Sequence, residues 1–376
     1  MRRCFCAASV TDEADYLKSI QGRWTVLTFL MLTLIVPGLI WTRQALADLS
    51  YDLPLPAFTT LLGKGRLRRH PPRNAADALA EVCGLDAPLP AAALRWYALR
   101  EHPGEADWLC LDPVRLRLEQ RSLVVDDPQR LKLTDEEAAS LAVSLAPTLA
   151  AFGRLEVISP QAWNFRLSAD APAFQPLPDT VGRHAAPLPQ DAAYAGWRHA
   201  ISEAQVLLHA HPVNQAREAA GQPVVNSLWP WGGGRLPALS GDTRDHTRTC
   251  PATCDTVWSN DPVAQGIARL FQIDYATLPG GFGDTISAVS ARAPLAVFEA
   301  LDNPSRTGDA LLWRENLERF EADWLVPALA ALRGGRLDAL RLIAPGEPGS
   351  AELQISRHDL WKFWRKPGAL TALGPT

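Results

Sequence analysis

Apolar residues recur at strand and helix spacing along most of the chain. Residues 32–36 are mostly apolar without alternation, which is typical of a strand buried on both faces of a parallel sheet. Residues 53–63 have apolar side chains three and four apart, an early proline and a final glycine, and predict a short helix. The same patterns predict helices at 75–83, 134–149, 263–271 and 309–332, and strands at 109–118, 123–125, 155–158, 296–301 and 337–343.

The order of these segments predicts the fold class. From residue 197 onward strands alternate with helices, which indicates an α/β fold with a mainly parallel sheet flanked by helices. Short strands dominate residues 89–190, which therefore predict a smaller α+β unit, ending in a proline- and alanine-rich loop. We predict one α/β domain over residues 31–376 that contains this unit. Residues 1–30 precede Met31, the only internal methionine, and are interpreted as an extension or as a start assigned too far upstream.

Residues 24–41 allow a second interpretation, as a signal peptide or membrane anchor, because they form an apolar stretch of nearly spanning length. Three threonines and the pair Pro37-Gly38 interrupt the stretch, and the residues before it mix acidic with basic side chains. We therefore prefer the buried strand and expect a cytoplasmic protein without a membrane partner. Membrane anchoring or export through residues 24–41 stays the alternative.

Composition narrows the classes of protein further. The 376 residues are 47% hydrophobic and 21% charged, as in a globular protein. The net charge of -4 gives no general basic face, so we expect no nucleic-acid partner. The six cysteines do not form a disulfide framework or paired zinc knuckles, which favours reduced thiols.

The run from residue 197 to 235 is the densest in special residues. Its spacing predicts a helix to about residue 210, a short helix that Pro212 begins and Gly221 ends, and a buried strand over residues 224–231. Gly232, Gly233 and Gly234 follow, then Arg235.

The glycines and Arg235 form the first candidate site. The carboxyl end of a strand in an open α/β sheet is where ligands bind, and an arginine beyond a glycine loop suits a phosphate or carboxylate. The alternative is that the glycines only make a tight turn and Arg235 is a surface charge.

Several segments together resemble the RpfE-type bacterial regulatory proteins, a family that looks related to cofactor-independent phosphoglycerate mutases of the archaeal type. The resemblance covers the chain from Met31 to its end. It rests on Pro37-Gly38, on the segments at 55–63, 108–114 and 203–212, on the tryptophan and glycine run at 226–234, and on residues 361–367.

The relation to the mutases implies an alkaline-phosphatase-like α/β fold, in which two metal ions activate a serine or threonine. This sequence departs from that pattern. Pro37-Gly38 stands where the mutases have Asp-Gly, and residues 66–84 contain no serine or threonine. No histidine follows Asp302 in its loop, and Ala344-Pro345-Gly346 replace an Asp-His pair.

We therefore hypothesise a non-catalytic regulatory protein that has no cofactor and binds an anionic ligand or a protein partner. The ligand-binding candidates are Asn226, Gly232, Gly233, Gly234, Arg235, His209, His211 and Asp302. The alternative is a mutase or phosphate-ester hydrolase that uses a divalent metal, for which His209, His211, Asp302 and Asp309 would have to converge. Helical spacing puts the two histidines on different faces, so we expect them to be structural, one of them bonded at a helix end.

The last segment is ambiguous. Residues 357–366 interleave arginine and lysine with tryptophan and phenylalanine, a composition that could bind single-stranded nucleic acid. We favour a terminal strand whose tryptophans complete the core while the charges stay in water.

Overall fold

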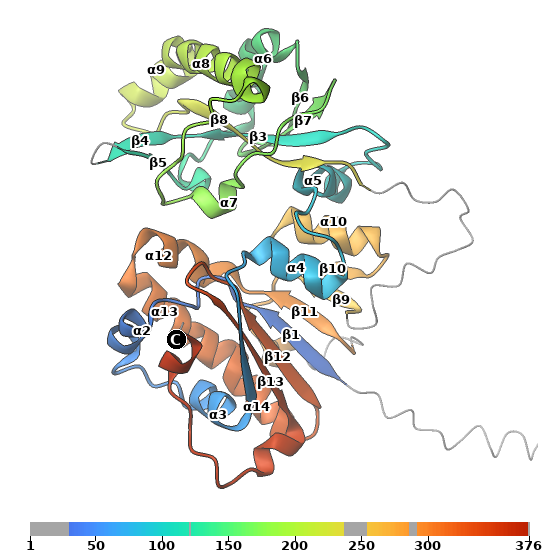
Figure 1. The fold of residues 1–376 in the computed structure, drawn as a ribbon, viewed down its shortest axis with the longest axis vertical. Helices are drawn as coiled ribbons and strands as arrows, with labels where there is room; N and C mark the ends of the chain where they lie inside the picture. Colours follow the sequence, from blue (N-terminus) through green and yellow to red (C-terminus); the bar gives the residue numbers. More distant parts are fainter. Residues whose placement is uncertain (1–29, 120–121, 237–253, 286–291, 375–376) are drawn as a thin grey trace, which may run out of the picture.

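The computed structural model describes residues 30–119, 122–236, 254–285 and 292–374 (Figure 1). The extension expected over residues 1–30 lies outside this part, except for Leu30. None of the described helices is long and apolar enough to cross a membrane.

Within the described residues, seven strands form a large sheet. Their order is β10 (Asp274–Ala276), β9 (Thr256–Trp258), β11 (Pro294–Val297), β1 (Met31–Ile35), β12 (Ala339–Ala344), β13 (Ser350–Ser356) and β2 (Arg66–His70). The strands from β10 to β12 run parallel, whereas β13 runs antiparallel to both of its neighbours. The prediction of a mainly parallel sheet that starts with a buried strand is confirmed.

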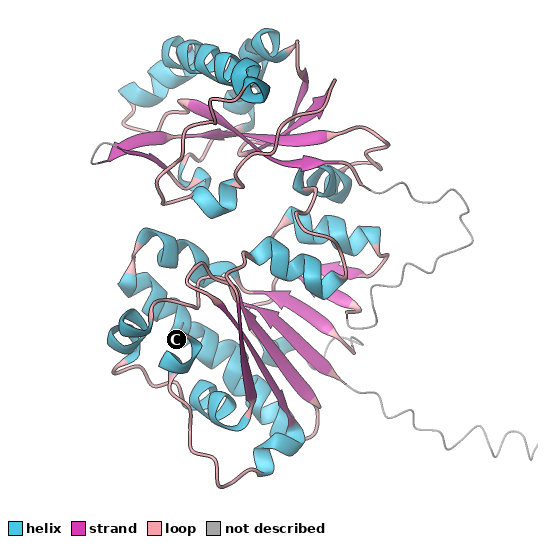
Figure 2. Ribbon diagram, in the orientation of Figure 1, coloured by secondary structure: helices cyan, strands magenta, loops and turns pink. Residues whose placement is uncertain are grey.

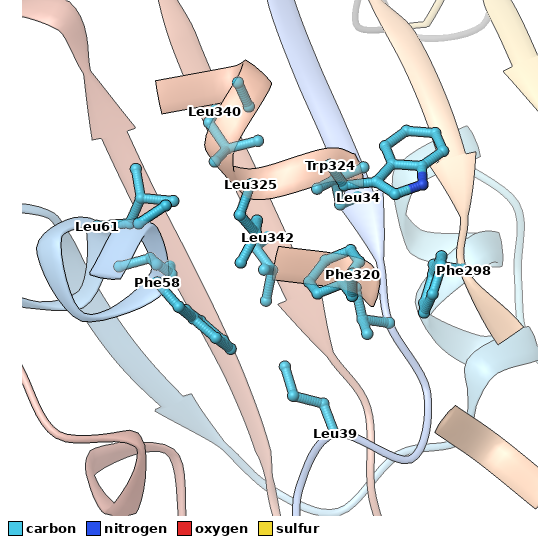
Figure 3. Packing of buried hydrophobic residues seen from close by; sticks show 14 of the residues in the cluster. Leu34, Leu39, Phe58, Leu61, Phe298, Phe320, Trp324, Leu325, Leu340 and Leu342 are labelled. Carbon is cyan, nitrogen blue, oxygen red and sulfur yellow. The ribbon is translucent and has the colours of Figure 1, made fainter. Parts of the chain in front are cut away.

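Helices cover both faces of this sheet (Figure 2). One face packs against α2 (Arg43–Ser50), α3 (Pro56–Lys64), α13 (Ala310–Phe320) and α14 (Val326–Arg333), and the other against α4 (Ala75–Cys83), α5 (Ala91–Leu99) and α10 (Pro262–Leu270). Leu34 belongs to the first core, with Phe58, Phe320 and Trp324 (Figure 3), and Ile35 belongs to the second. Because β1 contributes to both cores, its sequence is apolar without alternation.

A single π-helical turn, Glu321–Leu325, joins α13 to α14. The buried Glu321 carboxylate lies in this turn and accepts a hydrogen bond from the backbone N–H of Phe58 at 3.0 Å. Its second oxygen accepts the N–H of Ala57, so this one side chain satisfies two donors in the first turn of α3. The predicted helix over 309–332 is therefore confirmed, with one irregular turn that ties it to α3.

A second, antiparallel sheet lies above the first (Figure 1). In the described part it comprises β6 (Gly153–Ser159), β7 (Ala162–Leu167), β3 (Trp108–Val114) and β8 (Ser227–Gly234), in that order. Its outer face packs against α6 (Asp135–Leu149) and α8 (Ala195–Ala210), beside α9 (Pro212–Ala219). We call the described residues of 108–234 the small-sheet unit and the other described residues the large-sheet unit. The small-sheet unit thus reaches beyond residue 190, where the sequence led us to end it.

The described part also contains shorter elements. Among them are the hairpin of β4 (Leu116–Glu119) and β5 (Ser122–Val125), and the short helices α7 (Leu177–Thr180), α11 (Phe282–Thr285) and α12 (Asp302–Thr307).

Helix α5 lies between the small sheet and α10. Its alanine-rich face allows a close approach, and a Cβ added at Gly266 of α10 would lie 2.2 Å from the backbone oxygen of Leu94. On the opposite side, Trp96 of α5 stacks on Trp108 of β3 at a ring separation of 4.4 Å. Helix α5 of the large-sheet unit therefore packs against both α10 and the small sheet.

Two local predictions fail, and one strand was not predicted. Residues 66–70 form that strand, β2, because their backbone pairs with β13. The glycines after Trp231 belong to β8 in the antiparallel sheet, and are not a loop at the carboxyl end of a parallel strand. Residues 357–361 form a short 3₁₀ helix in place of a terminal strand.

Candidate functional site

A cleft of about 820 Å³ lies between the two units, at the carboxyl edge of the parallel strands. The large-sheet unit contributes residues that follow β1, β9 and β11 or precede α4: Pro37, Asn74, Asn260, Asp261, Glu299 and Asp302. The small-sheet unit contributes residues of β3 and β8: Asp112, Trp231, Gly232, Gly233 and Gly234. Ligand sites in α/β proteins form at this edge, so the cleft is the candidate functional site.

The Pro37-Gly38 turn shapes the floor of the cleft. Gly38 has a φ of +77°, and a Cβ added to it would lie 2.3 Å from the backbone oxygen of Leu301. Only glycine allows this approach of the turn to the start of α12. The turn therefore brings the end of β1 directly against Asp302.

Carboxylates gather on the large-sheet side. Asp261 caps α10 by accepting a hydrogen bond from the backbone N–H of Val263 at 2.9 Å. Asp302 forms a two-bond ion pair with Arg306, of which one bond measures 3.0 Å. Glu299 follows the end of β11 and is exposed to the cleft.

The pKa of Glu299 is raised to about 8. The main cause is desolvation by the walls of the cleft, and the negative charges of Asp261 and Asp302 add to it, whereas Arg306 opposes them. The side chain still has an exposed surface inside the cleft, so water there screens part of these interactions. Burial likewise raises the pKa of Asp261. The cleft therefore favours the protonated forms of Glu299 and Asp261.

On the small-sheet side, a buried ion pair forms the wall. Arg95 of α5 donates from its two Nη atoms to the two carboxylate oxygens of Asp112, both at 3.0 Å. Asp112 also accepts the indole N–H of Trp231 at 2.7 Å and the backbone N–H of Trp163 at 2.8 Å. The two arginines of the cleft lining, Arg95 and Arg306, thus both have carboxylate partners.

The predicted glycines do line the cleft, and the structure shows a packing reason for two of them. A Cβ added to Gly232 would lie 2.8 Å from the Cβ of Ala91, and one added to Gly234 would lie 3.1 Å from that of Pro90. Arg235 pairs with Asp107 at 2.7 Å, and 57% of its side chain is exposed. Close contact of β8 with the start of α5 therefore accounts for Gly232 and Gly234.

The other sequence candidates lie elsewhere. Asn226 bonds the backbone of Leu116 on both sides, accepting its N–H at 2.7 Å and donating to its oxygen at 2.8 Å. His209 is exposed at the end of α8. His211 caps α9, since its Nδ1 accepts the N–H of Val213, and its Nε2 lies 2.9 Å from the hydroxyl of Ser144.

The structure does not bring the two histidines to Asp302. Both lie at the outer helices of the small-sheet unit, whereas Asp302 lies in the cleft, and Asp309 caps α13 through the N–H of Leu312. Within the described ranges, no three histidine, cysteine or acidic side chains are placed to hold a metal ion. The residues that the structure describes therefore do not fit the two-metal centre that the resemblance implies.

The sequence did not lead us to predict Asp261 and Glu299 as site residues, although a local pattern points to them. Ser259-Asn260-Asp261-Pro262 is a polar segment between an apolar strand and an apolar helix, with an acidic cap and a proline in the first turn. Glu299 follows a buried strand in the same way. Their meeting depends on β9 and β11 being neighbours, which sequence periodicity does not show.

Comparisons with known proteins agree with the fold. No family model and no curated protein matches the chain. Among solved structures, the PH0037 protein from Pyrococcus horikoshii matches with a TM-score of 0.56 and 14% identity, over 88% of both chains. A cofactor-independent phosphoglycerate mutase from Thermoplasma acidophilum matches with a TM-score of 0.47 and 17% identity, over 93% of this chain and 95% of that one. The PH0037 protein shows a shared fold and nothing more, and none of the comparisons supports the regulatory family.

The raised pKa of Glu299 predicts how stability changes with pH. An acid whose pKa is near 4.5 when unfolded and about 8 when folded destabilises the fold as it ionises, so stability should fall as pH rises from about 4.5 to about 8. The Glu299→Gln variant should lose this fall and melt at a higher temperature than the parent at pH 8. Thermal unfolding at several pH values measures both. Asp261→Asn should shift the transition to lower pH, and an unchanged profile in both variants would contradict the assignment.

Proposed function

We propose that this chain is a non-catalytic regulatory protein on a phosphoglycerate-mutase-like fold, which acts by binding a ligand or partner in the cleft. The observation that carries the proposal is the set of residues at the carboxyl edge of the sheet. Pro37 follows β1, Asn74 caps α4 through the N–H of Asp77 at 2.7 Å, and Asp302 is held by Arg306. The resemblance would place metal ligands and a nucleophile in these regions.

The charge of the cleft bears on the ligand. Eight acidic residues line it, namely Asp77, Asp107, Asp112, Asp170, Asp179, Asp261, Glu299 and Asp302, against Arg95 and Arg306. Both arginines are paired, so a multiply charged anion would meet net repulsion. We therefore propose a neutral or cationic ligand, in place of the anion that Arg235 suggested.

Incubation of the purified protein with manganese and 3-phosphoglycerate tests the absence of mutase activity. We expect no product above the rate without protein, while a phosphoglycerate mutase assayed in parallel turns the substrate over. Product formed at a rate that a chelator abolishes would overturn the proposal. Calorimetric titration with 3-phosphoglycerate should show no binding, because the acidic lining repels it.

A phosphate-ester hydrolase is the second candidate, and Glu299 favours it. A carboxyl group whose pKa is raised toward neutral pH can act as a general acid. A chromogenic phosphate ester in the same assay distinguishes the two functions. Hydrolysis that is lost in Glu299→Gln would favour the enzyme.

A further inference from the structure

The carboxyl-terminal residues 357–367, which we call the aromatic segment, present three large rings to solvent. The exposed fractions are 80% for Trp361, 87% for Phe363 and 68% for Trp364. Of the tryptophans that the structure describes, only Trp361 and Trp364 are exposed. An exposed cluster of large apolar side chains marks an interaction surface, because leaving it in water is unfavourable.

The aromatic segment is held firmly on α3. The ammonium group of Lys64 donates to the backbone oxygens of Leu360 at 3.0 Å and Lys362 at 3.3 Å. A Cβ added to Gly63 would lie 2.1 Å from the backbone oxygen of Lys366, so the contact requires glycine there. Helix α3 therefore fixes the backbone from which the three rings project.

Basic residues alternate with the rings along the sequence. The aromatic segment contains Arg357, Lys362, Arg365 and Lys366 but one acidic residue, Asp359, which pairs with Lys362. Arg365 donates to the backbone oxygen of Gly65 at 3.2 Å, which places it beside the exposed Arg66 at the start of β2. A protein with a net charge of -4 thus has a local basic surface around its exposed rings.

The aromatic segment lies at the amino edge of the large sheet, opposite the cleft (Figure 1, bottom, red). The chain enters at the same edge, because Asp338 accepts the backbone N–H of Leu30 at 2.9 Å and pairs with Arg357 at 3.6 Å. In sequence, residues 24–30 are apolar apart from two threonines. Leu30 and the aromatic segment therefore lie at the same edge of the large sheet.

We propose that the aromatic segment docks this protein on an anionic lipid surface. Trp361, Phe363 and Trp364 enter the boundary between headgroups and acyl chains, where tryptophan is favoured, while Arg365 and Lys366 face the lipid phosphates. This proposal replaces the expectation of no membrane partner, and the cleft faces away from the lipid.

The geometry of the rings favours lipid over single-stranded nucleic acid. The rings of Phe363 and Trp364 meet edge to face, with an angle of 83° between their planes. Successive bases stack on aromatic faces, which this arrangement does not offer side by side. Rings that protrude from the surface suit insertion between headgroups.

Flotation of the full-length chain with vesicles tests the proposal. We expect binding to vesicles that contain phosphatidylglycerol and little binding to pure phosphatidylcholine. Replacing Trp361, Phe363 and Trp364 together with serine should reduce the partition coefficient about tenfold or more, and Arg365→Glu with Lys366→Glu should reduce it as well. The matched control replaces three exposed apolar residues of the small-sheet unit with serine, and should bind like the parent: Leu118, Val143 and Val206.

Circular dichroism melting verifies that each variant is folded. If the serine variant does not fold, vesicle binding by the charge variant tests the proposal in its place. Binding that survives both variants would assign the membrane contact to another part of the chain and overturn the proposal. Absence of binding by the parent would also overturn it. Salt-sensitive binding of a labelled oligothymidylate without vesicle binding would identify a nucleic-acid surface instead.

Discussion

Replacing Asp112 with alanine is expected to lower the free energy of unfolding by about 3–5 kcal/mol. The side chains of Asp112 and Arg95 are 4% and 7% exposed, so the guanidinium would be left charged in a buried place. The indole N–H of Trp231 and the backbone N–H of Trp163 would lose their acceptor as well. Urea unfolding followed by tryptophan fluorescence measures the change.

An exposed ion pair of the same sheet provides the control for this prediction. Arg154 and Glu156 are paired at 2.9 Å, but 80% of the arginine side chain is exposed. Glu156→Ala should therefore cost about 0–1 kcal/mol. Converting both buried partners, with Arg95→Met and Asp112→Leu, should recover a large part of the loss, because no unpaired charge remains. Equal losses of stability in Asp112→Ala and Glu156→Ala would show that burial does not set the contribution of the Arg95–Asp112 pair.

Gly38→Ala is expected to cost roughly 2–5 kcal/mol, as the sum of an unfavourable backbone conformation and a steric clash. Alanine at a φ of +77° is strained, and its Cβ would press on the backbone of Leu301 and Asp302. The variant should also open the floor of the cleft, since β1 and α12 must move apart. Chemical denaturation measures the stability.

Gly308 serves as a control that distinguishes the unfavourable backbone conformation from the steric clash. It has a similar φ of +71°, but an added Cβ would meet nothing within 4 Å. Gly308→Ala should therefore cost about 1–2 kcal/mol, the backbone contribution alone. If the two variants lose the same stability, the contact between Gly38 and Leu301 does not constrain the cleft.

The parts of the fold that local physics determines could be predicted from the sequence. The helix α6 begins where Thr134 and Glu137 exchange side-chain and backbone hydrogen bonds. A threonine followed three residues later by a glutamate predicts such a helix start. The strand β1 is apolar because helices cover both faces of the sheet. Neither prediction needed a distant partner.

The candidate site could be predicted only in part, because distant pairings decide it. The glycines of β8 looked like a loop until β3, more than a hundred residues earlier, supplied an antiparallel partner for Trp231 at Cys110. The tryptophans of the aromatic segment looked like core residues, since most tryptophans are largely buried. Their exposure follows from the route of the backbone around α3, and no periodicity in the sequence encodes that route.

The position of β1 in the large sheet has a consequence for synthesis on the ribosome. Its two neighbours, β11 and β12, begin at residues 294 and 339, so about 260 residues separate the end of β1 from the nearer one. At typical elongation rates this delay lasts roughly 13–50 s. The small sheet has all its strands once residue 234 has emerged. The small-sheet unit can therefore fold before the partner strands of β1 have been synthesised. During that time β1 is an exposed apolar segment of the nascent chain and is the part most prone to aggregation.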